Sequence, residues 1–131
     1  MIAEGDFEVT MTPLESDEGA GATLARLRLE KRYTGDLEAT ASGWMMSAVT
    51  ATEGSAGYVA LERVTGRLWG REGSFVLQHD GITDSGAPHL IVQVVPDSGT
   101  GELTGLRGTL EIIIDAEGHH YRFEGELAGA G

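Results

Sequence analysis

The chain has 131 residues, a formal net charge of −12 at pH 7, 20 glycines and no cysteine. A length near ~130 residues suits one domain, here residues 1–131, and the lack of cysteine excludes disulfides and cysteine-based metal sites. An acidic chain whose only lysine is Lys31 repels phosphates and anionic headgroups, so we expect no nucleic-acid or membrane partner. The acidic start and the lack of a long apolar run predict a cytoplasmic protein.

Short segments of alternating polar and apolar residues, separated by glycines, predict β-strands rather than long helices. The first such segment contains Phe7, Val9 and Met11. The next, Ala22–Arg32, alternates but is also rich in good helix formers, so we favour a strand and keep a helix as the alternative. The remaining strands are expected at residues 37–52 with a break at Gly43, and at 58–68, 74–80, 89–95, 109–115 and 119–127.

About eight antiparallel strands in a small domain favour a closed sheet, because open edges would leave backbone groups unpaired. We therefore predict an all-β fold, a closed antiparallel eight-stranded β-barrel with mostly up-and-down connectivity. A barrel of eight strands encloses either packed side chains or one small ligand.

Several long segments resemble a family of small bacterial proteins known only as a domain of unknown function. They are Phe7–Pro13, Gly54–Gly66, Gly70–His79 and Val94–Leu103. Together they extend the resemblance over nearly the whole chain. The resemblance implies a fold similar to that of allene oxide cyclase, an eight-stranded barrel that cyclises a reactive lipid epoxide in its interior. It therefore implies an isomerase or cyclase activity only by analogy of fold.

A carboxylate interrupts the apolar face of the fourth predicted strand. Period-2 alternation puts Tyr58, Ala60, Glu62 and Val64 on one face. If this face lines the barrel, Glu62 is a catalytic carboxylate with its pKa raised by desolvation, and Tyr58 is a hydroxyl donor beside it. If the face lies outside, Glu62 forms an ordinary surface ion pair.

The fifth predicted strand offers further candidates on both of its faces. Phe75 and His79 share the more apolar face, where His79 is either a general base in the lumen or a hydrogen-bonded histidine at the end of the strand. Gln78 lies on the opposite face, and Gln93 interrupts the next strand. We include Phe75, Gln78 and Gln93 as candidate ligand-binding residues, with an amide satisfied by a neighbouring strand as the alternative for Gln93.

Trp44 follows the glycine at which the third strand is expected to break. Its indole is a candidate for stacking on a flat unsaturated ligand, or it closes one end of the barrel as a plug.

Two further motifs, a protease-like sequence and a pair of adjacent histidines, do not indicate a protease or a metal site. Asp97–Thr100 matches a short aspartic-protease signature, but a polar turn after a strand explains it better. His119 and His120 are neighbours, which point to opposite faces of a strand and so do not converge on one metal ion. We expect no metal and no cofactor.

Three functional hypotheses remain. The first is an enzyme that binds a hydrophobic or unsaturated small molecule in its lumen and catalyses isomerisation or cyclisation. The second is a carrier that sequesters a small apolar ligand without chemistry. In the third, side chains fill the lumen and the protein acts through its surface or as a homo-oligomer. A titratable group that faces an open lumen favours the enzyme.

Overall fold

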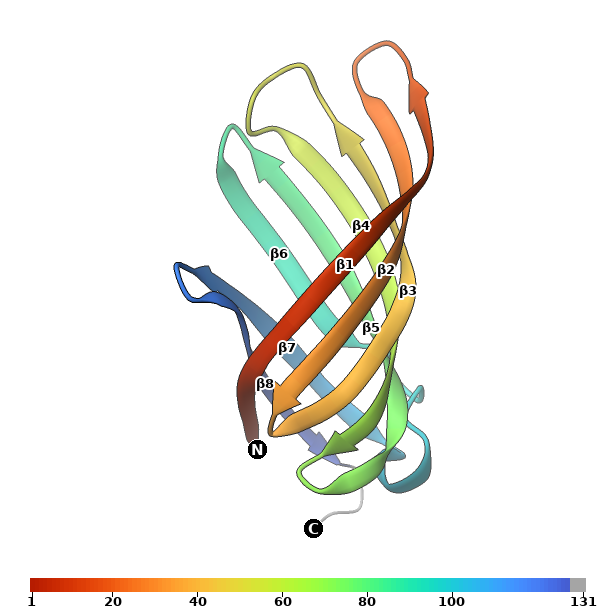
Figure 1. Ribbon diagram of the computed structural model, residues 1–131, viewed down its shortest axis with the longest axis vertical. Helices are drawn as coiled ribbons and strands as arrows, with labels where there is room; N and C mark the ends of the chain where they lie inside the picture. Colours follow the sequence, from red (N-terminus) through yellow and green to blue (C-terminus); the bar gives the residue numbers. More distant parts are fainter. Residues whose placement is uncertain (128–131) are drawn as a thin grey trace.

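Eight strands form one closed antiparallel barrel in which each strand pairs with its neighbours in the chain and the last pairs with the first (Figure 1). The computed structural model describes residues 1–127, so the last four residues of the expected domain lie outside it. The strands are β1 (Ile2–Glu18), β2 (Thr23–Gly35), β3 (Leu37–Val49), β4 (Ala56–Leu68), β5 (Arg71–Asp84), β6 (Ala87–Val94), β7 (Leu106–Asp115) and β8 (Gly118–Leu127). The expected all-β, up-and-down barrel is confirmed. Within residues 1–127, no helix has the length and apolar character needed to cross a membrane.

Alternation of side chains decides the structure of β2. Its residues Leu27, Leu29 and Tyr33 point inward, while Arg26 and its alternate neighbours point outward. The strand prediction for this segment is confirmed and the helical alternative is wrong. Although the residues are good helix formers, pairing with β1 and β3 over the whole strand outweighs their intrinsic propensity.

The expected break in β3 does not occur. The strand passes through Gly43 without interruption and ends at Val49. Gly43 is buried opposite Glu62, and a Cβ built on it would lie 1.8 Å from the carbonyl oxygen of Leu61. The glycine therefore permits a close approach of β3 to β4 rather than a bend.

Large side chains fill one half of the barrel, at the end where the N-terminus lies (Figure 1). Tyr33 and Tyr121 pack edge to face with ring centroids 5.6 Å apart, and Phe75 packs against Phe123 at 6.4 Å. The Tyr121 hydroxyl donates a hydrogen bond to the carbonyl of Thr34 at 2.8 Å. This half is a packed, mainly apolar core that closes the barrel.

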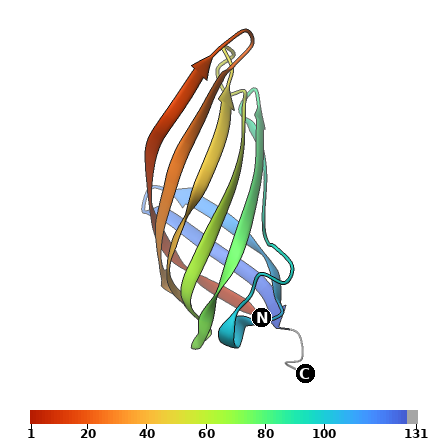
Figure 2. The same ribbon diagram turned by 90° about the vertical axis from the view of Figure 1, so that its right-hand side faces the viewer.

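The other half of the barrel is open. β6 and β7 share a single register pair, Gln93 with Thr109, and β1 pairs with β8 only through its first residues, Ile2–Phe7. Beyond these pairs the short β7–β8 hairpin diverges from the long strands, as the two views of the ribbon show (Figures 1 and 2). Side chains, not a continuous ladder of hydrogen bonds, bound the lumen there.

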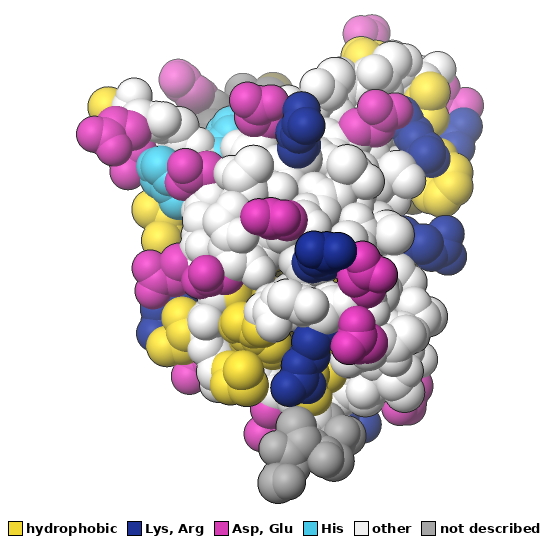
Figure 3. Space-filling model, turned by 60° about the horizontal axis from the view of Figure 1, so that its bottom comes forward, with side chains coloured by type: hydrophobic (Ala, Val, Ile, Leu, Met, Phe, Trp, Pro, Cys, Tyr) yellow, Lys and Arg dark blue, Asp and Glu magenta, His cyan; other side chains and the backbone are white. Residues whose placement is uncertain are grey.

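Acidic and basic side chains alternate over the closed end of the molecule (Figure 3). The face in this view has no large area of one sign, although the whole chain has a net charge of −12. On this face, therefore, charges of both signs are interspersed.

Candidate functional site

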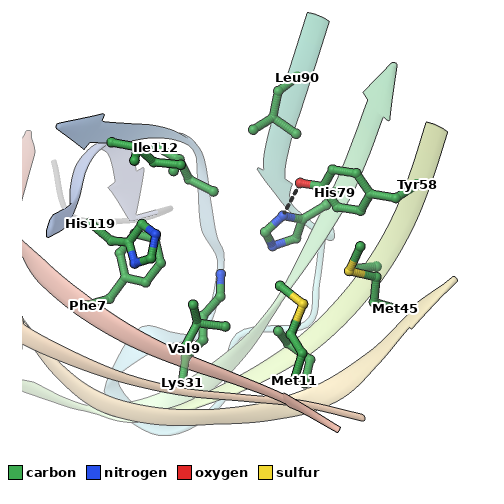
Figure 4. Close-up of a pocket in the computed structure, with 13 residues that line it drawn as sticks. Phe7, Val9, Met11, Lys31, Met45, Tyr58, His79, Leu90, Ile112 and His119 are labelled. Carbon is green, nitrogen blue, oxygen red and sulfur yellow. Dashed lines mark hydrogen bonds between the residues drawn. The ribbon is translucent and has the colours of Figure 1, made fainter. Parts of the chain in front are cut away.

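A pocket of about 290 Å³ occupies the open half of the lumen. Its lining consists of Phe7, Val9, Met11, Leu29, Lys31, Met45, Tyr58, Ala60, His79, Leu90, Ile112, Ile114 and His119. The walls are mainly apolar, and Met11, Leu90 and Ile114 at the rim are exposed. Four polar side chains enter the pocket: Lys31 rises from its floor, Tyr58 and His79 lie on one side, and His119 lies on the other (Figure 4).

A buried carboxylate lies beneath the pocket. Glu62, on β4, is 1% exposed and accepts hydrogen bonds from three side chains on two other strands, β2 and β5. The ammonium of Lys31 donates to its Oε2 at 2.8 Å, and the hydroxyl of Tyr33 donates to its Oε1. His79 Nε2 lies 2.6 Å from the same Oε2. We call these four residues, Lys31, Tyr33, Glu62 and His79, the Glu62 cluster.

Tyr58 extends this cluster into the pocket. Its hydroxyl lies 3.3 Å from Nδ1 of His79, whose Nε2 contacts Glu62 (Figure 4). A neutral His79 that donates from Nε2 to the carboxylate accepts the Tyr58 hydroxyl at Nδ1. If His79 is protonated, Nδ1 becomes a donor and the Tyr58 hydroxyl is free to donate to a ligand. The chain Tyr58–His79–Glu62 can therefore move a proton to or from the pocket.

Glu62 is a carboxylate rather than a carboxylic acid. Burial alone would raise the pKa of Glu62. The hydrogen bond from His79 and the charge of Lys31 together lower it by more than burial raises it, so the net shift is downward. The expected rise in the pKa of Glu62 is therefore wrong, because desolvation is outweighed by the cluster's own donors. The interior placement of Glu62 is confirmed. Glu62 lies behind His79 and Lys31 and does not itself line the pocket, so its expected catalytic role stays a prediction.

Tyr58 keeps its proton in the resting protein. Burial raises its pKa, and the negative charge of Glu62 raises it further. A protonated phenol with a raised pKa is a hydrogen-bond donor. Tyr58 and His79, two of the expected catalytic residues, thus lie together at the pocket, while their chemical roles stay predictions.

Phe75 points into the lumen but not into the pocket. Its ring is buried in the packed half, below the Glu62 cluster, where it contacts Phe123. Phe75 therefore does not line the pocket, and no ligand in the open half of the lumen would contact it.

The other three expected ligand-binding residues lie on the outer surface. Gln78 and Gln93 are exposed neighbours on β5 and β6, opposite in orientation to His79 and Val92. Trp44 is 53% exposed on β3, with the guanidinium of Arg28 at 4.7 Å from its ring centroid. Neither expected role of Trp44, stacking in the lumen or plugging it, is correct. Without a break at Gly43, strict alternation sends Trp44 outward.

Two polar residues of the pocket were missed by the sequence analysis. Lys31 follows Leu27 and Leu29 in the inward alternation of β2, and this position on an apolar face was the available signal. His119 shares the face of Tyr121 and Phe123 on β8, and it stacks on Phe7 with ring centroids 5.2 Å apart. No feature of the sequence relates Lys31 to Glu62, because their pairing depends on the register of three strands.

The adjacent histidines and the protease-like motif at Asp97–Thr100 have ordinary structural roles. His119 points inward and His120 points outward. The Nδ1 of His120 lies 2.5 Å from Oδ1 of Asp6, and its Nε2 lies 2.9 Å from Oδ1 of Asp115. Asp97 and Ser98 form a turn after β6, in which Ser98 Oγ accepts a hydrogen bond from the amide of Val76 at 3.0 Å. Among residues 1–127, no group of three or more His, Cys, Asp or Glu side chains is arranged to hold a metal ion.

Comparison with known proteins identifies relatives but no activity. Residues 3–125 match a family described as a protein of unknown function, DUF3224. A crystal structure of a protein with unknown function from the same family, from Shewanella oneidensis MR-1, is 48% identical, with a TM-score of 0.95 over 99% of this chain and 98% of that one. No curated protein matches the chain. The expected similarity to allene oxide cyclase stays a prediction.

Proposed function

Because the chain belongs to the DUF3224 family, whose function is unknown, we propose a function from the site: the barrel binds a hydrophobic or unsaturated small molecule and isomerises it by proton transfer through Tyr58. One observation carries the proposal. The relay Tyr58–His79–Glu62 ends in a mainly apolar pocket of about 290 Å³, which has room for a small ligand. A cytoplasmic location is part of the same proposal, since a chain without cysteine needs no oxidising compartment.

The proposed reaction moves one proton and needs no co-reactant. The Tyr58 oxygen accepts a proton from a ligand carbon next to an unsaturated or carbonyl group, while the hydroxyl proton passes to His79 Nδ1. Glu62 stabilises the imidazolium, and the ammonium of Lys31 stabilises the negative charge left on the ligand. Return of the proton to a different carbon completes an isomerisation, and the protein recovers its initial state.

The apolar walls support this chemistry in two ways. They exclude water, which strengthens the interaction of Lys31 and His79 with charge that develops on the ligand. They also hold a flexible chain in a limited set of conformations, as a cyclisation requires.

Proton abstraction can be tested with octan-2-one in D₂O, a small ketone whose α-protons are exchangeable. We expect the protein to accelerate incorporation of deuterium, measured by NMR, and Tyr58→Phe to reduce the acceleration by about 100-fold or more. Tyr121→Phe is the matched control, because it removes a hydroxyl in the packed half, and it should keep the acceleration. Equal rates in wild type and Tyr58→Phe would refute the role of Tyr58.

A carrier is the second candidate, and one observation favours it. Every buried side-chain nitrogen and oxygen within residues 1–127 already has a hydrogen-bond partner. Each polar atom of the Glu62 cluster therefore has a partner without a ligand, and the cluster can serve stability alone. A protein that binds octan-2-one but leaves its rate of deuterium exchange unchanged is a carrier.

A further inference from the structure

The polar lining of the pocket has the opposite charge character to the rest of the molecule. The chain has 21 acidic residues against 9 lysines and arginines, yet in the part that the structure describes no acidic side chain lines the pocket. The only lysine of the chain and two of its four histidines do line it. We propose that the ligand is an anion, a small and largely apolar carboxylate whose oxygens are bound by Lys31. This inference rests on the proposed function in taking the lumen as the binding site.

Lys31 has a hydrogen-bond donor to spare. An ammonium has three N–H groups. One donates to Glu62 at 2.8 Å, and a second faces the Tyr33 hydroxyl at 3.4 Å. The remaining donor is available to the pocket that Lys31 lines, whereas both oxygens of Glu62 already accept bonds from the cluster.

The surroundings of Lys31 favour a charged ammonium at this position. Its Nζ lies 4.8 Å from the ring centroid of Phe7 and 5.6 Å from that of Tyr33, which are favourable cation–π distances. The ring of His119 stacks on the same Phe7 ring. A carboxylate at Lys31 thus lies at the floor of the pocket, with Phe7 and His119 on one side and His79 and Tyr58 on the other (Figure 4).

The lining also limits the rest of the ligand. Among residues 1–127, one lysine and no arginine line the pocket, which suits a single negative charge, whereas a phosphate group needs more donors. From the floor the chain of the ligand extends past Tyr58 to the apolar rim of Met11, Leu90 and Ile114. An unsaturated carboxylate would place its carbon chain at Tyr58 and delocalise negative charge onto the oxygens at Lys31.

The charge preference can be measured with three ligands of equal chain length: octanoate, octan-1-ol and octylammonium. Each competes with the neutral fluorescent probe N-phenyl-1-naphthylamine for the full chain. We expect octanoate to bind on the order of tenfold more tightly than octan-1-ol, and octylammonium to bind most weakly. Equal or tighter binding of octan-1-ol would overturn the proposal.

Two variants identify the charge that is responsible. Lys31→Met alone leaves Glu62 buried without its cation, so the double variant Lys31→Met/Glu62→Gln is used, which removes both charges of the pair. It should lose the preference for octanoate and keep the binding of octan-1-ol. Arg28→Met removes a positive charge from the outer face of the same strand and should keep the preference. An equal loss in Arg28→Met would overturn the assignment to Lys31.

The same experiment separates this inference from the proposed function. If neither the probe nor octan-1-ol binds, the lumen is not a ligand site and the proposed function fails. If both bind and octanoate has no advantage, only the inferred class of ligand is wrong.

Discussion

Glu62→Leu is expected to lower the free energy of unfolding by about 3–5 kcal/mol. The substitution removes the common acceptor of Lys31, Tyr33 and His79 and leaves a buried ammonium without a counter-charge. Leucine has a similar volume, so the loss reports the broken polar cluster rather than a cavity. Equilibrium unfolding in urea, followed by circular dichroism, measures it.

An exposed ion pair gives the matched control. Arg67 and Glu72 also lie 2.8 Å apart, but their side chains are 59% and 66% exposed, so Glu72→Leu should cost less than about 1 kcal/mol. Similar losses in the two variants would contradict the account of the Glu62 cluster.

The acid side of the stability profile provides a second check on Glu62. Since folding lowers its pKa, the carboxylate contributes stability above the ordinary carboxyl pKa, and that contribution is lost as the pH falls through the lowered value. This loss of stability at acid pH should be absent in Glu62→Gln, because the glutamine side chain does not titrate.

Gly43→Ala should also strongly destabilise the barrel, at the upper end of the ~1–3 kcal/mol typical of overpacking. The added Cβ would meet the backbone oxygen of Leu61 at 1.8 Å and Cα of Glu62 at 2.8 Å, and backbone atoms cannot move aside without separating β3 from β4. The separation would also disturb the position of Glu62.

Gly19→Ala is the corresponding control for Gly43→Ala. The nearest atom to its Cβ would be the carbonyl oxygen of Ala22 at 4.0 Å, so thermal unfolding should be nearly unchanged. An unchanged melting temperature in Gly43→Ala would show that β3 and β4 do not approach as closely as described.

The barrel was predictable from the sequence because the signals are local. Alternation in each strand and glycine between the strands set the element type, and few small folds close eight antiparallel strands. The same alternation correctly grouped Tyr58 with Glu62, and Phe75 with His79. The prediction failed at Trp44, because Gly43 was expected to break the strand. Gly43 instead lies within a continuous strand and permits close packing of β3 on β4.

The site was only partly predictable, because its chemistry depends on contacts between distant strands. The sign of the pKa shift of Glu62 follows from His79 and Lys31, which are 17 and 31 residues away and meet it only in the folded sheet. How far the core fills the lumen depends on the sizes of side chains from all strands. For this reason Phe75, although on the correct face, lies in the packed half below the pocket.

The central claim is that the open half of the lumen binds small apolar molecules, and titration with N-phenyl-1-naphthylamine tests it most directly. Wild type should increase the fluorescence of the probe with one site per chain. Ala60→Phe, which adds a ring to the pocket wall, should abolish the increase in a protein that circular dichroism shows to be folded. Val59→Phe adds the same ring to the outer face, where Val59 is 54% exposed, and should leave binding unchanged. Undiminished binding in Ala60→Phe, or its loss in Val59→Phe, would contradict a ligand site in the lumen.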